Sequence, residues 1–164
     1  MMEKEINPEI MFLGKEERYK EMLSIVRAVI ENEKDIIANM ANVAAILKEL
    51  FSFLWVGFYL VKEKELVLGP FQGPLACTRI QFGKGVCGTA WEKKKILLVP
   101  DVNEFPGHIA CNSKSSSEIV VPLFHNKEVW AVLDIDSSET NYFTLTDSHY
   151  LNQLGELISN QTYK

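Results

Sequence analysis

A strong β-strand pattern occupies residues 53–61, which read Phe53-Leu54-Trp55-Val56-Gly57-Phe58-Tyr59-Leu60-Val61. β-Branched and aromatic residues favour strands, and the run lacks the three- and four-residue spacing of a helix. Successive side chains of a strand point to opposite faces of the sheet. The sequence therefore predicts a strand with Leu54, Val56, Phe58 and Leu60 on one face and Trp55, Gly57 and Tyr59 on the other.

Helical and extended patterns alternate on both sides of this strand. Apolar residues recur at helical steps from Glu16 onward, and a second helical stripe follows Asp35, which is a suitable N-cap. Thr146 is expected to start a final helix. The expected helices cover residues 16–30, 36–51, 88–94 and 146–161, and the other expected strands cover 64–69, 76–81, 96–99, 118–124 and 128–136.

These elements predict an α+β fold with an antiparallel sheet of about six strands. The N- and C-terminal helices should cover one face of the sheet, because their apolar stripes need a partner surface. The opposite face should then be covered by loops or serve as a pocket floor, and the long loop 100–117 is the expected cover. Residues 1–15 are expected to form an N-terminal arm, and residues 16–164 a single catalytic domain.

Composition excludes several classes of protein. A formal charge of −5, without a basic face, argues against nucleic-acid binding. The longest apolar stretch, residues 51–61, is far shorter than the roughly 20 residues that span a bilayer, so no membrane association is expected. The N-terminus lacks the pattern of a signal peptide, and three cysteines cannot all pair within one chain. We therefore expect a cytoplasmic protein whose cysteines serve reactivity, metal binding or packing.

Acidic side chains gather on the face of the sheet that carries Trp55 and Tyr59. In the strand 128–136, alternation places Val129, Ala131, Leu133 and Ile135 on one face and Trp130, Val132, Asp134 and Asp136 on the other. Two carboxylates on one strand face lie roughly 6–7 Å apart, which is unfavourable unless water or a cation is present. Glu118 begins another strand directly after the long loop. These acids are either solvated strand ends or the floor of a pocket for a ligand with an ammonium group.

The three cysteines occupy different settings. Cys111 lies in the long loop, Cys77 near the start of an expected strand, and Cys87 at an expected helix N-terminus, where the helix dipole would lower the pKa of a thiol. Local chemistry alone therefore leaves Cys111 and Cys87 as competing candidates for the reactive thiol. A zinc site built from His108, Cys111 and a second cysteine, and a Cys111–His108 dyad, are the alternatives.

Several sequence blocks together resemble the free methionine-(R)-sulfoxide reductases, which are stand-alone enzymes of the GAF-domain fold. The blocks occur in the family's order between about residues 16 and 160. They are Trp55-Val56-Gly57-Phe58-Tyr59, Gly69-Pro70-Phe71-Gln72-Gly73, Ala76-Cys77-Thr78-Arg79-Ile80, Gly85-Val86-Cys87-Gly88, Phe105-Pro106-Gly107-His108-Ile109-Ala110-Cys111 and Ser117-Glu118-Ile119-Val120-Val121-Pro122. The resemblance implies a six-stranded antiparallel sheet between helices, with the substrate pocket opposite the terminal helices.

The resemblance also implies roles for the cysteines and the pocket residues. Cys111 matches the cysteine that attacks the substrate, Cys77 the resolving cysteine, and Cys87 an auxiliary one. The chain departs from the family's pattern at Leu54 and Asn112, where relatives often carry a polar residue and an aspartate, and Asn112 could alter the charge beside Cys111. The residues that match the family's pocket are Trp55, Tyr59, Glu118, Asp134 and Asp136.

The expected reaction needs no bound cofactor. Cys111 would attack the sulfoxide sulfur and become a sulfenic acid, which Cys77 would convert to a disulfide. A thioredoxin-like reductant, supplied by NADPH through thioredoxin reductase, would restore the thiols. Glu118 or Asp136 would donate the proton that the sulfoxide oxygen requires. A homodimer is possible by analogy with relatives, and the alternative function is a non-catalytic GAF-type sensor of a small molecule or of redox state.

Overall fold

The computed structural model describes residues 5–164, which contain a six-stranded sheet in the order β3-β2-β1-β6-β5-β4. Every neighbouring pair of strands is antiparallel, which confirms the predicted α+β class. The central strands β1 and β6 are hydrogen-bonded to each other. The strands are β1 (Trp55–Lys62), β2 (Glu65–Gln72), β3 (Arg79–Gln81), β4 (Leu97–Val99), β5 (Ser117–His125) and β6 (Glu128–Ser137).

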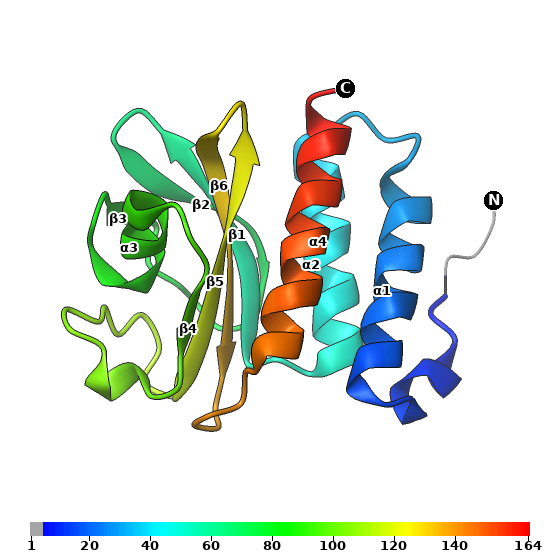
Figure 1. The fold of residues 1–164 in the computed structure, drawn as a ribbon, viewed down its shortest axis with the longest axis horizontal. Helices are drawn as coiled ribbons and strands as arrows, with labels where there is room; N and C mark the ends of the chain where they lie inside the picture. The colour runs from blue at the N-terminus through cyan, green and yellow to red at the C-terminus, as the bar shows by residue number, and fades with distance from the viewer. Residues whose placement is uncertain (1–4) are drawn as a thin grey trace.

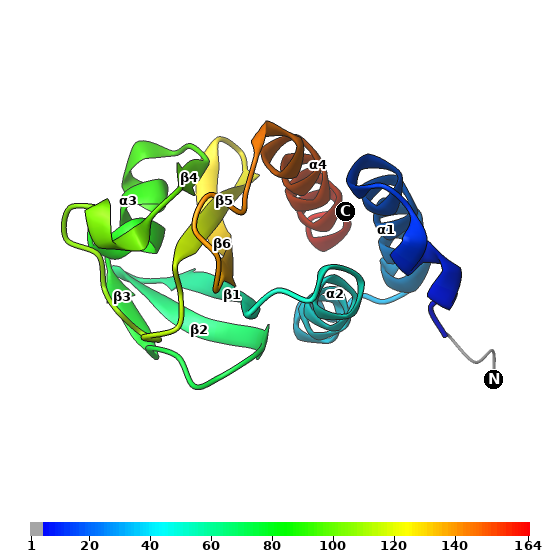
Figure 2. The same ribbon diagram turned by 90° about the horizontal axis from the view of Figure 1, so that it is seen from below.

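Helices cover both faces of the sheet, in unequal amounts (Figures 1 and 2). Two long helices lie directly against one face, and a third lies outside them, away from the sheet. The short α3 lies on the opposite face with the long loop. The helices are α1 (Lys15–Ile30), α2 (Ile36–Phe51), α3 (Gly85–Lys93) and α4 (Leu145–Thr162), with the short 3₁₀ helices η1 (Pro8–Phe12) and η2 (Val102–Glu104).

The sheet separates two apolar clusters, and β1 contributes to both. Val56 and Phe58 belong to the larger cluster under the helices, whereas Trp55 and Tyr59 belong to the smaller cluster on the other face. This division confirms the alternation predicted for β1. The helices thus bury most of the core on one side, and the opposite side is left for a pocket.

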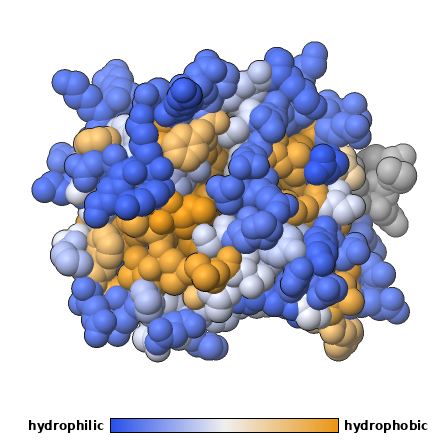
Figure 3. All heavy atoms as spheres, viewed as in Figure 1, coloured by the Kyte–Doolittle hydropathy of each residue, from blue (hydrophilic) through white to orange (hydrophobic). Residues whose placement is uncertain are grey.

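The edge of the sheet formed by β5 and β4 is only partly covered by α4. The widest apolar area in Figure 3 lies over β4 and β5, beside α4. Edge strand β4 contributes half-buried Leu98 to the helix-side core, and half-buried Ile96 just before the strand does the same.

The predicted faces are wrong at the start of β6. Leu123 pairs with Ala131 and Phe124 pairs with Val129, so Trp130 is an extra residue in the ladder. This β-bulge reverses the alternation before Ala131. Val129 consequently joins the pocket-side cluster, while Trp130 packs towards the helices and donates from Nε1 to Ser159 Oγ at 2.9 Å.

Several predicted boundaries differ from the structure, and for three of them the structure shows the reason. The last helix begins after Thr144 rather than at Thr146, because Thr144 and Asp147 form a reciprocal capping box. The helix predicted from residue 88 begins at Gly85, whose φ of +59° allows the turn into α3. The strand predicted over residues 76–81 is limited to β3, because the segment before it crosses over the pocket, where Tyr59 donates a hydrogen bond to the Cys77 carbonyl at 2.9 Å.

The segment before α1 was expected to be an arm. Within it, residues 1–4 lie outside the described part of the chain. The following residues include η1, where Ile10 is buried against the helix-side core. No helix among the described residues is both long and apolar enough to cross a membrane.

Candidate active site

A pocket lies on the face of the sheet that α2 and α4 leave uncovered. Its walls come from β1, β5, β6, α3 and the loop before β5. Its lining includes every residue predicted for substrate binding, namely Trp55, Tyr59, Glu118, Asp134 and Asp136, and also Cys87, His108 and Cys111.

Strand register brings the three acidic residues together. Glu118 of β5 pairs with Asp136 of β6, and Asp136 pairs on its other side with Trp55 of β1. Asp134 lies two residues before Asp136 and therefore points to the same face. Glu118 is 6% exposed and Asp134 is 7% exposed, so the acids form a pocket floor and are not solvated strand ends.

The environment makes these carboxyl groups weak acids. Burial raises the pKa of Glu118 well above its ordinary value, and the neighbouring charges of Asp134 and Asp136 add to the effect. Burial, with the charge of Asp134, likewise raises the pKa of Asp136, although a hydrogen bond from Ser115 opposes the shift. Burial raises the pKa of Asp134 to about 6. The floor can therefore hold protons close to neutral pH.

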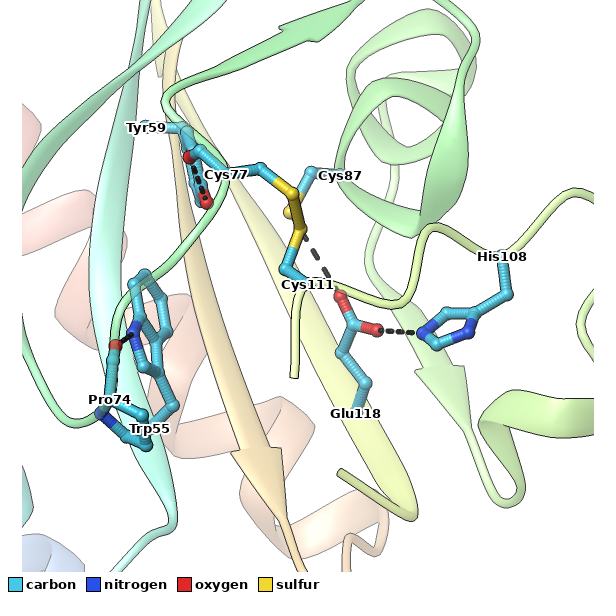
Figure 4. The surroundings of a disulfide bond; sticks show 8 residues. All are labelled: Trp55, Tyr59, Pro74, Cys77, Cys87, His108, Cys111 and Glu118. Atoms are coloured by element: carbon cyan, nitrogen blue, oxygen red, sulfur yellow. Dashed lines mark hydrogen bonds and ion pairs between the residues drawn. A yellow bond between two sulfur atoms is a disulfide. The ribbon is translucent and has the colours of Figure 1, made fainter. Parts of the chain in front are cut away.

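Two aromatic side chains form a wall beside the acids. The rings of Trp55 and Tyr59 stack with centroids 6.0 Å apart. Trp55 Nε1 donates to the Pro74 carbonyl at 3.1 Å, and the Tyr59 hydroxyl donates to the carbonyl of Cys77 (Figure 4). Both polar groups are thus occupied in holding the 74–77 segment, and the rings offer apolar surface to a ligand.

Cys77 and Cys111 are joined by a disulfide over this floor (Figure 4). Their Cα atoms are 5.5 Å apart, although 34 positions separate them in the sequence. The long loop thus brings Cys111 to the segment that Tyr59 holds. Because the Cys111 sulfur is bonded to Cys77, the zinc site considered with Cys111 as a ligand is not formed in this structure.

Cys87 is the free cysteine of the described chain, and it is buried. We expected the dipole of its helix to lower the pKa of its thiol, and this expectation is wrong. Burial raises the pKa of the Cys87 thiol well above its ordinary value, and the charges of Asp134 and Glu118 raise it further. Desolvation and neighbouring carboxylates outweigh the end of a nine-residue helix. Cys87 is therefore a poor thiolate nucleophile at neutral pH.

His108 points towards Glu118 (Figure 4). The distance from His108 Nε2 to Glu118 Oε2 is 3.9 Å. Burial lowers the pKa of His108, while the pKa of Glu118 is raised, so both groups tend towards their neutral forms near pH 7. The geometry therefore favours a polar contact between His108 and Glu118 over the Cys111–His108 dyad considered above.

Sequence reasoning did not find Ser115. This residue donates a short hydrogen bond from Oγ to Asp136 Oδ1 and lines the pocket. Serine is common in loops, so the run 115–117 gave no signal that one hydroxyl faces the site. Only the fold of the loop against β6 shows it.

Comparison with known proteins identifies the family of this chain. A family model described as GAF domain matches residues 32–160. The chain is 55% identical over 148 residues to GAF domain-containing protein A of Dictyostelium discoideum, covering 90% of this chain and 94% of that protein. It is 44% identical over 143 residues to the free methionine-R-sulfoxide reductase of Escherichia coli, with 87% of each chain covered.

Comparison with a solved structure indicates the same family. The free methionine-R-sulfoxide reductase of Neisseria meningitidis, in complex with its substrate, matches with a TM-score of 0.90 and 51% sequence identity. The match covers 92% of this chain and 91% of that one. The chain therefore belongs to the GAF-domain family and, within it, to the free methionine-R-sulfoxide reductases.

Proposed function

We propose that this protein reduces free methionine-(R)-sulfoxide to methionine, with Cys111 as the nucleophile and Cys77 as the resolving cysteine. The observation that carries the proposal is the Cys77–Cys111 disulfide, which lies over a buried carboxyl floor in a chain of this family. A disulfide at this place is the product expected after one round of sulfoxide reduction.

The floor and the aromatic wall suit the two ends of the substrate. Glu118 or Asp136 would donate the proton to the sulfoxide oxygen, and the remaining carboxylates of the floor would bind the α-ammonium group, which a peptide-bound methionine sulfoxide lacks. Trp55 and Tyr59 would contact the apolar S-methyl end. The requirement for a free ammonium group gives a physical reason for selecting the free amino acid.

The reaction balances with thiols alone. Cys111 Sγ attacks the sulfoxide sulfur, and the oxygen, protonated by Glu118 or Asp136, passes to Cys111 as a sulfenic acid while methionine leaves. The Cys77 thiol then attacks this sulfenic acid, a water molecule departs, and the disulfide forms. A thioredoxin-like dithiol reduces the disulfide by thiol–disulfide exchange and is itself oxidised.

The acidic floor argues against the sensor alternative when the ligand is a cyclic nucleotide. A phosphate needs cationic side chains or exposed backbone N–H groups. The residues that line the pocket include three acids and no lysine or arginine.

The proposal is tested by following NADPH consumption with thioredoxin and thioredoxin reductase. Free methionine-(R)-sulfoxide, its (S)-epimer and a peptide containing the sulfoxide are offered in parallel. We expect turnover with the free (R) compound alone, lost in Cys111→Ser and kept in Ser113→Ala, an exposed control in the same loop. Turnover that survives in Cys111→Ser would overturn the assignment of the nucleophile.

A further inference from the structure

The proposed reaction uses Cys111 and Cys77 and leaves Cys87 without a role. Cys87 Sγ, one oxygen of Glu118 and one oxygen of Asp134 all lie within 4.8 Å of one another. The three residues come from α3, β5 and β6, and they are 2%, 6% and 7% exposed, respectively. The packing of three elements, rather than one local turn, therefore holds this cluster together.

Asp134 has an unsatisfied hydrogen-bond acceptor. Its Oδ1 is buried and has no partner at hydrogen-bonding distance among the described residues, and the nearby side chains that lower its pKa as donors are Glu118 and Cys87 when they carry their protons. Leaving a buried polar atom unpaired is energetically costly, and such atoms are rare in folded proteins. A cation bound between Asp134 and its neighbours would remove that cost.

The donor set indicates the class of ion. A thiolate with two carboxylates suits Zn²⁺, whereas Mg²⁺ and Ca²⁺ prefer oxygen ligands alone. With Zn–O of about 2.1 Å and Zn–S of about 2.3 Å, tetrahedral geometry places ligand atoms roughly 3.3–3.8 Å apart. Cys87 Sγ and Glu118 Oε1 are 4.0 Å apart, and the three donor atoms all lie within 4.8 Å, so shifts of up to about 1 Å would bring them into that range.

We propose that the pocket floor binds a divalent, thiol-preferring metal ion such as Zn²⁺ through Cys87 Sγ and the carboxylates of Glu118 and Asp134. The thiol loses its proton to solvent as the metal–sulfur bond forms. Three protein ligands leave the fourth position to water.

The ion would be an inhibitor. It occupies Glu118 and Asp134, which the proposed function assigns to proton donation and to binding of the substrate's ammonium group. This consequence rests on the proposed function, whereas metal binding itself does not. Zn²⁺ should therefore raise the apparent KM for free methionine-(R)-sulfoxide, and added substrate should relieve the inhibition.

Binding is measured with Co²⁺ as a spectroscopic substitute for Zn²⁺ on the full-length oxidised protein. In this form Cys77 and Cys111 are bonded to each other, so Cys87 is the thiolate available to the metal. We expect a thiolate-to-cobalt charge-transfer band in the near ultraviolet that saturates at one ion per chain and is abolished by Zn²⁺. The readout requires no enzymatic activity, so it separates a failure of the metal site from a failure of the proposed function.

Variants identify the ligands. Cys87→Ser should lose the charge-transfer band, and Asp134→Asn should weaken Co²⁺ binding at least about tenfold. His149→Gln, which removes an exposed histidine on α4, should leave binding unchanged. If Cys87→Ser does not fold, the Co²⁺ affinities of Asp134→Asn and Glu118→Gln still test whether these carboxylates are ligands. Any one of three results would overturn the proposal. The unaltered protein could lack the band, the band could persist in Cys87→Ser, or both carboxylate variants could bind Co²⁺ with unchanged affinity.

Discussion

Burial determines the chemistry of each ionisable side chain in the pocket. The pKa values of Glu118, Asp134 and Asp136 are raised chiefly by desolvation, so these groups can act as proton donors as well as anions. The same effect suppresses the thiolate of Cys87. Burial therefore favours the protonated form of the three carboxyl groups and of the Cys87 thiol alike.

Replacing Glu118 by Gln tests the role of proton donor. If Glu118 supplies the proton, kcat should fall by about 10²–10⁴, the usual contribution of general acid catalysis, while KM changes less. Because the acid must be protonated, kcat of the unaltered protein should fall as pH rises through the raised pKa of Glu118. Steady-state kinetics across pH measure both effects. Asp136→Asn is assayed in parallel, and an unchanged kcat in Glu118→Gln would exclude Glu118 as the donor.

Replacing Cys77 by Ser tests the resolving step. Without Cys77 the sulfenic acid on Cys111 has no partner in the chain, and thioredoxin has no disulfide to reduce. We expect about one methionine released per protein chain, followed by arrest, as measured by rapid quenching and amino-acid analysis. Dithiothreitol, a small thiol that can reduce the sulfenic acid directly, should restore turnover. Continuous turnover with thioredoxin in Cys77→Ser would show that another route resolves the intermediate.

Asp134 should make the free energy of unfolding depend on pH. Its pKa is about 6 in the fold, against an ordinary value of 3.8, so the folded protein binds the proton more tightly. The stabilisation from this proton is complete below about pH 4 and is lost as pH rises through about 6. A shift of that size corresponds to roughly 3 kcal/mol as an upper figure, because Asp134 titrates together with Glu118.

Asp134→Asn should remove this part of the pH dependence. We expect the difference in unfolding free energy, variant minus unaltered protein, to be more positive at pH 8 than at pH 4. Urea unfolding at the two pH values, with the disulfide kept oxidised, measures the change. An equal difference at both pH values would show that Asp134 does not titrate as described.

The members of the pocket could be predicted from the sequence, but their environment could not. Strand alternation placed Trp55, Tyr59 and Asp134 on one face because β1 pairs with the later part of β6 without a register shift. The direction of the Cys87 pKa shift depends on carboxylates from β5 and β6, which no local pattern places beside α3. The hydrogen bond from Ser115 likewise depends on how the loop folds.

At the level of elements, a buried carboxylate joins α1 to α4. Asp147, at the start of α4, accepts hydrogen bonds from the Tyr19 hydroxyl and from Lys15 Nζ, both at 2.7 Å. It also accepts from Thr144 N at 2.7 Å in the capping box. Asp147 and Tyr19 are both 0% exposed. Because α1 lies outside α2 and α4, this network fixes it to the rest of the domain (Figure 2).

Tyr19→Phe should destabilise the protein without affecting catalysis. Removing the hydroxyl leaves an Asp147 oxygen underpaired in the interior, which costs about 1–3 kcal/mol. Tyr150→Phe is the matched control, because the Tyr150 hydroxyl donates to Glu16, whose side chain is 56% exposed and can turn to water. Urea unfolding of the two variants and their kcat values are compared. Equal losses of stability in both variants would contradict the special importance of the buried network.

The fold could be predicted wherever one local rule governed an element. Apolar spacing gave α1 and α2, because each presents a single stripe to the core. The bulge at Trp130 could not be predicted, since it depends on the pairing of β6 with β5. The start of α4 was misplaced because Thr144 and Thr146 are both good caps in isolation, and only the reciprocal bond with Asp147 distinguishes them.

At the level of the whole molecule, the sheet keeps stability and chemistry on opposite faces. The larger apolar cluster lies under α2 and α4, and the acids and cysteines lie on the other face. Burying ionisable groups destabilises the fold, and the larger core, which does not take part in the reaction, offsets that loss of stability. The disulfide is the one covalent link across the pocket side, so its redox state should affect the stability of the whole domain.

Reducing the disulfide should lower the free energy of unfolding. Cys77 and Cys111 close a loop with a sequence separation of 34. Loss of that constraint on the unfolded chain corresponds to about 4 kcal/mol in the chain-entropy account, and measured values commonly lie near 2–4 kcal/mol. Urea unfolding of the oxidised protein and of the protein with a non-thiol reductant gives the difference. Cys77→Ser should match the reduced protein whether or not reductant is present. Equal stability of the oxidised and reduced forms would mean that the unfolded chain gains no freedom when the link is broken, and that reduction of the disulfide does not alter the domain's stability.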